Sequence, residues 1–210
     1  MSQKNLIELA KRKYDSLPSH GNPSVPDQVS LVVSFLQSRK IWFRLSRNQT
    51  SGGCKDAASK RRRSGLIGIP VHDELKSILC DYEVDGKRRV AIAHCRASQR
   101  VDFSKLKRLL KARRKPQLIR LSDFGLKDDV IFGLVNPWFS LQRPDIYRLL
   151  SPAANWVQVF DKDLLRKSES PRTVMTNAGD RGWGIELYSK QLFSAILDEK
   201  NVGDFGRVPT

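Results

Sequence analysis

Apolar residues recur along the chain with two different periods, and the longer period predicts helices. Apolar positions three and four residues apart form a stripe in four segments: 5–17, 27–37, 103–113 and 190–197. Pro26 stands where the second of these helices would begin, and Asp102 can cap the first turn of the third. Pro116 lies just beyond the end of the third segment, where a helix is expected to stop.

Short apolar runs of strand-like composition fill most of the remaining chain. Strands are expected at seven places: 41–45, 75–84, 89–94, 118–121, 156–160, 173–176 and 183–187. Asp85 and Gly86 separate the second and third strands, and both residues tolerate positive φ, which favours a tight hairpin. Because strands and helices are mixed without strict alternation, we predict an α+β fold with a mixed β-sheet and flanking helices.

The same pattern divides the chain into three parts. Residues 1–38 are predicted to form a helical N-terminal extension, residues 39–200 one domain, and residues 201–210 a tail. The stretch 131–142 contains Gly, Asn, Pro and large aromatic residues, so we expect a loop there. Hydrophobic residues make up 40% of the 210 residues, which is enough for a packed core and argues against a disordered chain.

The chain is strongly basic, and this narrows the class of partner. Its formal net charge of +16 predicts attraction to polyanions, of which nucleic acid is the usual one. Anionic membrane is a weaker candidate, since the basic residues are spread over the chain and no apolar run approaches the ~20 residues needed to span a bilayer. Residues 1–14 lack the apolar stretch of a secretion signal, so we expect a cytoplasmic protein, with an organelle as the alternative.

The usual groups for metal-dependent or nucleophilic hydrolysis are missing from the sequence. The three cysteines (Cys54, Cys80 and Cys95) are widely spaced, and the histidines do not form a metal-binding pair. There is no nucleophile elbow and no phosphate-binding loop of the Gly-Lys-Ser type. We therefore expect neither a metal nor another cofactor.

A series of short motifs resembles one known family. In chain order they lie at 68–79, 100–103, 133–137, 159–165, 176–187 and 191–192. Within the first, Lys76 begins a strand and is followed by a small hydroxyl residue and aliphatic residues; the third reads Gly-Leu-Val-Asn-Pro. Together these motifs resemble the YbaK / prolyl-tRNA-synthetase-associated editing domains, from about residue 41 to residue 197. That resemblance implies an α+β editing domain without its own metal.

The resemblance also implies an activity. Members of this family hydrolyse the ester that joins an amino acid to the terminal adenosine of tRNA, so we expect an aminoacyl-tRNA deacylase acting in trans, with tRNA and a synthetase as partners. An ester is reactive enough that placement, a polar cradle and a hydroxyl of the substrate can supply much of the catalysis. The implied catalytic residues are Lys76, Gly133 and Pro137. The implied substrate-binding residues are Leu134, Val135, Asn136, Asn177 and Gly179.

Two dense basic clusters are predicted to hold the body of the tRNA. The first contains Lys60, Arg61, Arg62 and Arg63, and the second contains Lys107, Lys111, Arg113, Arg114 and Lys115. The second cluster is expected on the polar side of the 103–113 helix, where like charges repel one another and gain from a nearby anion. An ordinary solvated surface is the alternative for both.

Other interpretations stay open at this point. A non-catalytic tRNA- or RNA-binding module on the same fold would share the charge and the fold but would not need Lys76 or the 133–137 loop. A DNA-binding protein would need a helix face that reads bases, and the 103–113 helix lacks the Asn and Gln residues common on such a face. The 176–179 stretch has no histidine, unlike some proline-tRNA-editing relatives, so the amino acid removed stays undetermined.

Overall fold

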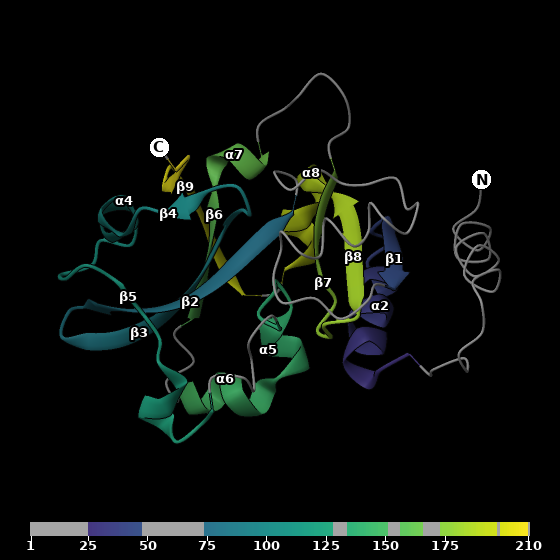
Figure 1. Ribbon diagram of the computed structural model, residues 1–210, viewed down its shortest axis with the longest axis horizontal. Helices are drawn as coiled ribbons and strands as arrows, with labels where there is room; N and C mark the ends of the chain where they lie inside the picture. The colour runs from purple at the N-terminus through teal and green to yellow at the C-terminus, as the bar shows by residue number, and fades with distance from the viewer. Residues whose placement is uncertain are drawn as a thin grey trace.

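Two β-sheets of different size form the framework of the protein (Figure 1). The structure is a computed structural model that describes residues 25–47, 74–127, 134–150, 156–165, 173–196 and 198–209. The larger sheet has five strands in the order β5-β2-β3-β6-β9, and the smaller has three in the order β1-β8-β7. A further pair of short strands joins β10 to β4. Helices and mixed strands together confirm the predicted α+β class.

The larger sheet is mixed because its two halves run differently. Strands β5, β2 and β3 are antiparallel neighbours, whereas β3, β6 and β9 are parallel. Its strands are β2 (Leu75–Val84), β3 (Lys87–Arg96), β5 (Gln117–Leu118), β6 (Trp156–Asp161) and β9 (Glu199–Gly203). The β2–β3 hairpin closes at Asp85 and Gly86, which both have positive φ (52° and 70°), as the sequence predicted.

The smaller sheet is antiparallel throughout. It consists of β1 (Phe43–Arg47), β7 (Thr173–Asn177) and β8 (Trp183–Tyr188). A bridge between Glu74 and Met175 connects the start of β2 with β7, so the two sheets meet there. The remaining strand pair is β4 (Arg100–Val101) with β10 (Gly206–Arg207).

Helices cover both faces of the larger sheet. Helix α4 lies against one face, and α5 and α6 lie toward the opposite side (Figure 1). The helices are α2 (Asp27–Ser38), α4 (Phe103–Leu109), α5 (Phe139–Gln142), α6 (Pro144–Leu150), α7 (Lys162–Leu165) and α8 (Ser189–Leu192). Two 3₁₀ turns complete the elements, η2 (Leu121–Phe124) and η4 (Phe193–Ala195).

Helix α2 is part of the main core. Val29, Val32 and Leu36 have no exposed surface and pack in one apolar cluster with residues of β7 and β8, including Ile185 and Leu187. The helical periodicity seen in the sequence therefore points this face into the domain. A boundary at residue 38 does not separate α2 from the fold.

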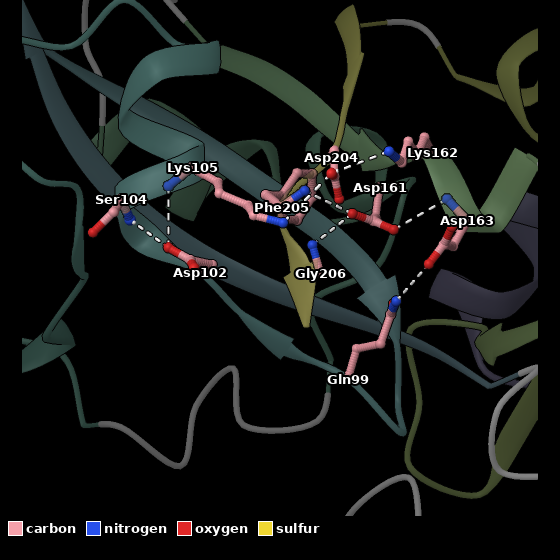
Figure 2. Close-up of polar contacts among 10 residues, drawn as sticks. All are labelled: Gln99, Asp102, Ser104, Lys105, Asp161, Lys162, Asp163, Asp204, Phe205 and Gly206. Carbon is pink, nitrogen blue, oxygen red and sulfur yellow. Dashed lines mark hydrogen bonds and ion pairs between the residues drawn. The ribbon is translucent and has the colours of Figure 1, made fainter. Parts of the chain in front are cut away.

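The end of the described chain is fastened to the larger sheet by a buried carboxylate (Figure 2). Asp161 accepts hydrogen bonds from the backbone N–H groups of Phe205 at 2.8 Å and Gly206 at 2.5 Å. Asp204 lies between two lysines, 3.4 Å from Lys105 of α4 and 3.1 Å from Lys162 of α7. Residues 201–207, predicted as part of a tail, instead include strand β10 and the end of β9.

Helix α6 was not predicted from the sequence, and helix α4 and the segment 131–142 differ from the prediction. Helix α4 ends at Leu109 because Lys111 takes a left-handed conformation (φ 52°) and the N–H of Ala112 bonds back to the carbonyl of Lys107. The predicted loop 131–142 contains α5 at its end, where Phe139 turns into the core with no exposed surface. The basic segment around residues 55–63 lies outside the described residues.

Candidate functional site

The buried amide of Asn136 joins two segments that lie far apart in the sequence. Its Nδ2 is 2.9 Å from Oδ1 of Asn177 at the end of β7 and 2.7 Å from Oε1 of Gln142 in α5. Its Oδ1 accepts a hydrogen bond from the backbone N–H of Trp138 at 2.7 Å. Asn136 has no exposed surface, so these bonds form away from water and are strong. The segment 134–138 is thereby fixed against the β7–β8 turn.

The amide of Asn177 strengthens the same junction from the other side. Its Nδ2 donates to the carbonyl of Val135 at 3.0 Å, and its Oδ1 also accepts from the backbone N–H of Gly179 at 3.0 Å. Asp180 closes the turn by accepting the N–H of Gly182 at 2.7 Å. Asn and Asp are common at such places because their short side chains can bond the backbone two residues further on.

Gln142 makes a third connection, to helix α2. Its Nε2 donates to the carbonyl of Ala178 at 2.6 Å and to the carbonyl of Gln28 at 3.0 Å. Gly179 passes so close to this amide that a Cβ on residue 179 would lie 2.1 Å from Nε2, and its φ of +92° also favours glycine. The need for glycine here thus has a local cause, which is the approach of the turn to Gln142.

A cleft opens beside this junction. It has a volume of about 510 Å³ and is lined by Gln28, Leu134, Arg143, Gly179, Asp180, Arg181 and Gly182. Its charged lining residues are two arginines and one carboxylate, Asp180, and its two glycines leave backbone accessible to a ligand.

One of the two arginines is held by a neighbouring carboxylate. The guanidinium of Arg143 contacts Asp145 through two hydrogen bonds, Nε to Oδ1 at 3.2 Å and Nη2 to Oδ2 at 2.9 Å. The pKa of Asp145 is lowered, chiefly by this contact with Arg143. No hydrogen bond from Nη1 of Arg143 is found among the described residues, so this nitrogen can still donate to an anionic ligand.

A second polar chain supports the 134–138 segment from within the larger sheet. The carbonyl of Pro137 accepts a hydrogen bond from Nε2 of Gln158 at 2.8 Å, and the Gln158 Oε1 lies 2.9 Å from Nε2 of His94. His94 Nδ1 in turn lies 2.8 Å from the hydroxyl of Ser77. Burial lowers the pKa of His94 to about 3, so the ring is neutral at pH 7. It then donates from Nε2 to Gln158 and accepts at Nδ1 from Ser77.

Lys76 is not part of either chain. It neighbours Ser77 on β2, and successive residues of a strand point to opposite faces, so Lys76 is directed away from His94. Its ammonium group donates to the backbone carbonyl of Gln99 instead. The structure therefore does not bring Lys76 together with Asn136, and its catalytic role stays a prediction.

Comparison with known proteins identifies the fold. No family model matches the sequence, and no curated protein matches it. Among solved structures, a hypothetical protein, APE2540, has a TM-score of 0.57 at 18% identity, over 84% of this chain and 99% of the other. A structure described as "a putative trans-editing enzyme for prolyl tRNA synthetase" has a TM-score of 0.57 at 16% identity, over 88% of this chain and 99% of the other. The chain shares their fold. The shared fold supports the YbaK-like resemblance of the sequence at the level of the fold.

The five predicted substrate-binding residues come together, and Pro137 of the predicted catalytic residues lies with them. Leu134, Val135, Asn136 and Pro137 lie on one side of the junction, and Asn177 and Gly179 lie on the other. Gly133 and the cluster Lys60–Arg63 lie outside the described residues.

Other contributors to the site were missed from the sequence. These are Gln28, Gln142, Arg143, Asp180, Arg181 and Gly182. A buried glutamine carries no periodic signal, and the arginines look like any other basic surface residue until the fold places them at a cleft.

The described part of the chain contains no cluster of three or more His, Cys, Asp or Glu side chains that could bind a metal ion. Among the helices in the described ranges, none is long and apolar enough to cross a membrane.

Proposed function

We propose that the protein is an aminoacyl-tRNA deacylase that acts in trans on mischarged tRNA. The observation that carries this proposal is the junction at Asn136, which fixes the 134–138 segment and the β7–β8 turn beside one cleft that Arg143 and Arg181 line. Rigid backbone segments of this kind suit a reaction that depends on placement of an ester. The fold shared with a structure described as a trans-editing enzyme supports the same conclusion.

The cleft suits the charged 3′ end of a tRNA. A volume of about 510 Å³ is in the range of small-molecule sites and can hold an aminoacyl group with part of the terminal nucleoside. Arg143 and Arg181 would attract the nearby phosphate, and the backbone at Gly179 allows the ribose to approach closely. Asn136 acts as a positioning residue, since its own polar atoms are already used in the junction.

The proposed reaction is hydrolysis by water. The water oxygen bonds to the ester carbonyl carbon, the bond from that carbon to the ribose oxygen breaks, and the ribose oxygen leaves with a proton. The neighbouring ribose hydroxyl of the substrate orients the water. The described residues that line the cleft include no Ser, Cys, Thr or His, and hydrolysis by water needs no such nucleophilic side chain.

Lys76 is proposed to assist from outside the cleft wall. Its partner in this structure is a neutral carbonyl, and within the described residues no carboxylate forms an ion pair with it. Because no carboxylate is found in the described ranges to neutralise it, the ammonium group of Lys76 can attract an anion. A phosphate oxygen of the substrate, being charged, would be a stronger acceptor for the Lys76 ammonium group than the Gln99 carbonyl.

A second candidate function is a non-catalytic tRNA- or RNA-binding module. It is favoured by one observation, the position of Lys76 away from the Asn136 junction. The net charge of +16 fits both candidates equally. The two are distinguished only by whether an ester bond is broken.

The deciding experiment is a panel of mischarged tRNAs incubated with the purified protein in the presence of a chelator. We expect release of amino acid from at least one of them, with a rate lowered at least tenfold by Arg143→Ala. Arg148→Ala is the matched control, because Arg148 is exposed on α6 close in sequence and does not line the cleft. Lys76→Met, which removes the charge and keeps much of the length, should also slow release. A panel left untouched by the wild-type protein would favour the binding module.

A further inference from the structure

The closed end of the β2–β3 hairpin and the segment that follows α4 lie side by side. The backbone N–H of Arg113 donates to the carbonyl of Glu83 on β2 at 2.8 Å, and further along Asp81 is paired with Gln117 of β5. On the other side of β2, Arg88 of β3 is opposite Glu83. Three stretches of chain therefore run next to one another at this end of the larger sheet, as Figure 1 also shows.

These stretches and the end of α4 carry many cations, together called the basic surface here; it continues round the edge of the sheet, because Arg88 points to the opposite face from Lys87 and Arg89. Its basic residues are Lys87, Arg88, Arg89, Lys107, Arg108, Lys111, Arg113, Arg114 and Lys115. The carboxylates among them are Asp81, Glu83 and Asp85.

Only part of the positive charge of the basic surface is neutralised locally. Arg88 is paired with Asp81 at 2.9 Å, and Arg113 with Glu83 at 3.4 Å. No other ion pair of the nine cations is found within the described residues. Like charges held this close repel one another, and an anionic partner would relieve that repulsion.

Most of these cations are exposed, whereas Arg89 and Lys107 are half-buried. Ala112 and Pro116 are buried, so they anchor the segment, while Arg114 and Lys115 between them are exposed. The guanidinium of Arg88 lies over the ring of Phe124 at 4.7 Å, which holds that side chain in place. Because the backbone beneath these cations is anchored, less of the chain has to be ordered when they bind a row of phosphates.

The surface lacks what single-stranded nucleic acid would use. Bases of single strands stack on exposed aromatic rings. Among the described residues here, Tyr82 is buried and Phe124 is covered by Arg88; the one large exposed apolar side chain is Leu118. One leucine offers little to insert into a membrane. The regular phosphate rows of a duplex are the better match.

We propose that the basic surface binds the phosphate backbone of double-helical RNA. The inference rests on the proposed function, in which the partner is a tRNA, and adds where its helical part is held. Lys87 and its neighbours on the hairpin extend the contact beyond the residues that follow α4. Binding here is independent of base sequence, since the contacts are with phosphates.

The test is binding of a blunt RNA duplex, labelled for fluorescence anisotropy, over a series of salt concentrations. The variant Arg114→Glu/Lys115→Glu reverses the charge of two residues for which the described part of the chain shows no ion pair. The control, Lys40→Glu/Lys190→Glu, makes the same change of charge elsewhere, since Lys40 follows α2 and Lys190 lies on α8. Each phosphate contact contributes about 0.9 to the slope of log K against log salt, so two lost contacts weaken binding roughly 60-fold at 0.1 M salt. The control pair should stay within about threefold. Lys87→Glu alone should lower the slope of log K against log salt by about 0.9, the value for one phosphate contact.

Three outcomes overturn the inference: equal weakening by the two double variants, tighter binding of single-stranded RNA than of duplex, or binding of anionic vesicles and not of duplex. The first outcome would mean that binding depends on net charge alone, the second that it depends on base stacking, and the third that the partner is a lipid surface. Deacylation of a short acylated hairpin, too small to reach the basic surface, is measured in parallel. The Arg114→Glu/Lys115→Glu protein should deacylate it at the wild-type rate. Loss of duplex binding with no deacylation by any form would retain the surface and reject the proposed function.

Discussion

Removing the amide of Asn136 should cost much of the stability of the domain. Asn136→Ala deletes the bonds to Gln142, Asn177 and the N–H of Trp138, together with a 3.0 Å bond to the carbonyl of Leu134. Net contributions of about 1 kcal/mol per hydrogen bond give a loss of about 3–4 kcal/mol, because the partners left behind are buried. For a chain of this size each kcal/mol lowers Tm by about 2–4 °C, so Tm should fall by roughly 6–16 °C.

Two further variants test whether the loss of stability comes from the hydrogen bonds of Asn136 or from substitution of any asparagine. Asn136→Asp keeps the shape but puts an oxygen where Nδ2 now donates, so we expect a loss at least as large. Asn201→Ala removes an exposed asparagine whose described hydrogen bond is to its neighbour Val202, and should change stability by less than about 0.5 kcal/mol. Urea unfolding followed by circular dichroism measures all three. A loss below about 1 kcal/mol in both Asn136 variants would refute the view that this residue holds the two segments together.

Three other predictions follow from single positions. In urea unfolding, Gly179→Ala should lower the free energy of unfolding by about 2 kcal/mol or more. Gly86→Ala, also at positive φ but with open space around it, should lower it by about 1 kcal/mol. Equal losses in the two variants would contradict the close approach of residue 179 to Gln142. His94 has a pKa of about 3 when folded, below its ordinary value of 6.5, so the unfolded chain takes up the proton first and stability falls by about 1.4 kcal/mol per unit as the pH drops below 6.5; His94→Gln should remove this part of the pH dependence, and identical pH curves would contradict it. Lys111→Gly should raise stability by about 0.5–1 kcal/mol, because Lys111 has a φ of 52°, and Lys111→Ala, which removes the same charge, should give no such gain in thermal unfolding.

Local patterns in the sequence were sufficient for most of the large elements. The hairpin at Asp85 and Gly86 was predictable because its turn chemistry is local, and α2 because its apolar stripe matches one helical face. The end of α4 was wrong by four residues, since a lysine in a left-handed conformation leaves no mark in the sequence. Strand β9 was missed because its parallel pairing with β6 depends on a segment far away in the chain.

Only part of the candidate site could be predicted from the sequence. The motif around Asn136 and the turn at Asn177 could be placed in one site through family resemblance, and the structure shows them bonded to each other. The contribution of Gln142 could not be foreseen, because its three partners come from separate parts of the chain. The direction of Lys76 depends on the register of β2, which shifts a side chain to the other face with each residue.

The late position of β9 and β10 has a consequence for synthesis of the protein on the ribosome. Strand β6 pairs with β9, and the carboxylate of Asp161 is satisfied by residues 205 and 206. At about 5–20 residues per second, β9 is translated roughly 2–8 seconds after the rest of the larger sheet. During that interval the nascent chain exposes β6 as an open edge, and Oδ2 of Asp161 lacks its two backbone donors. Chains released before residue 199 should therefore be the ones that aggregate or bind chaperones.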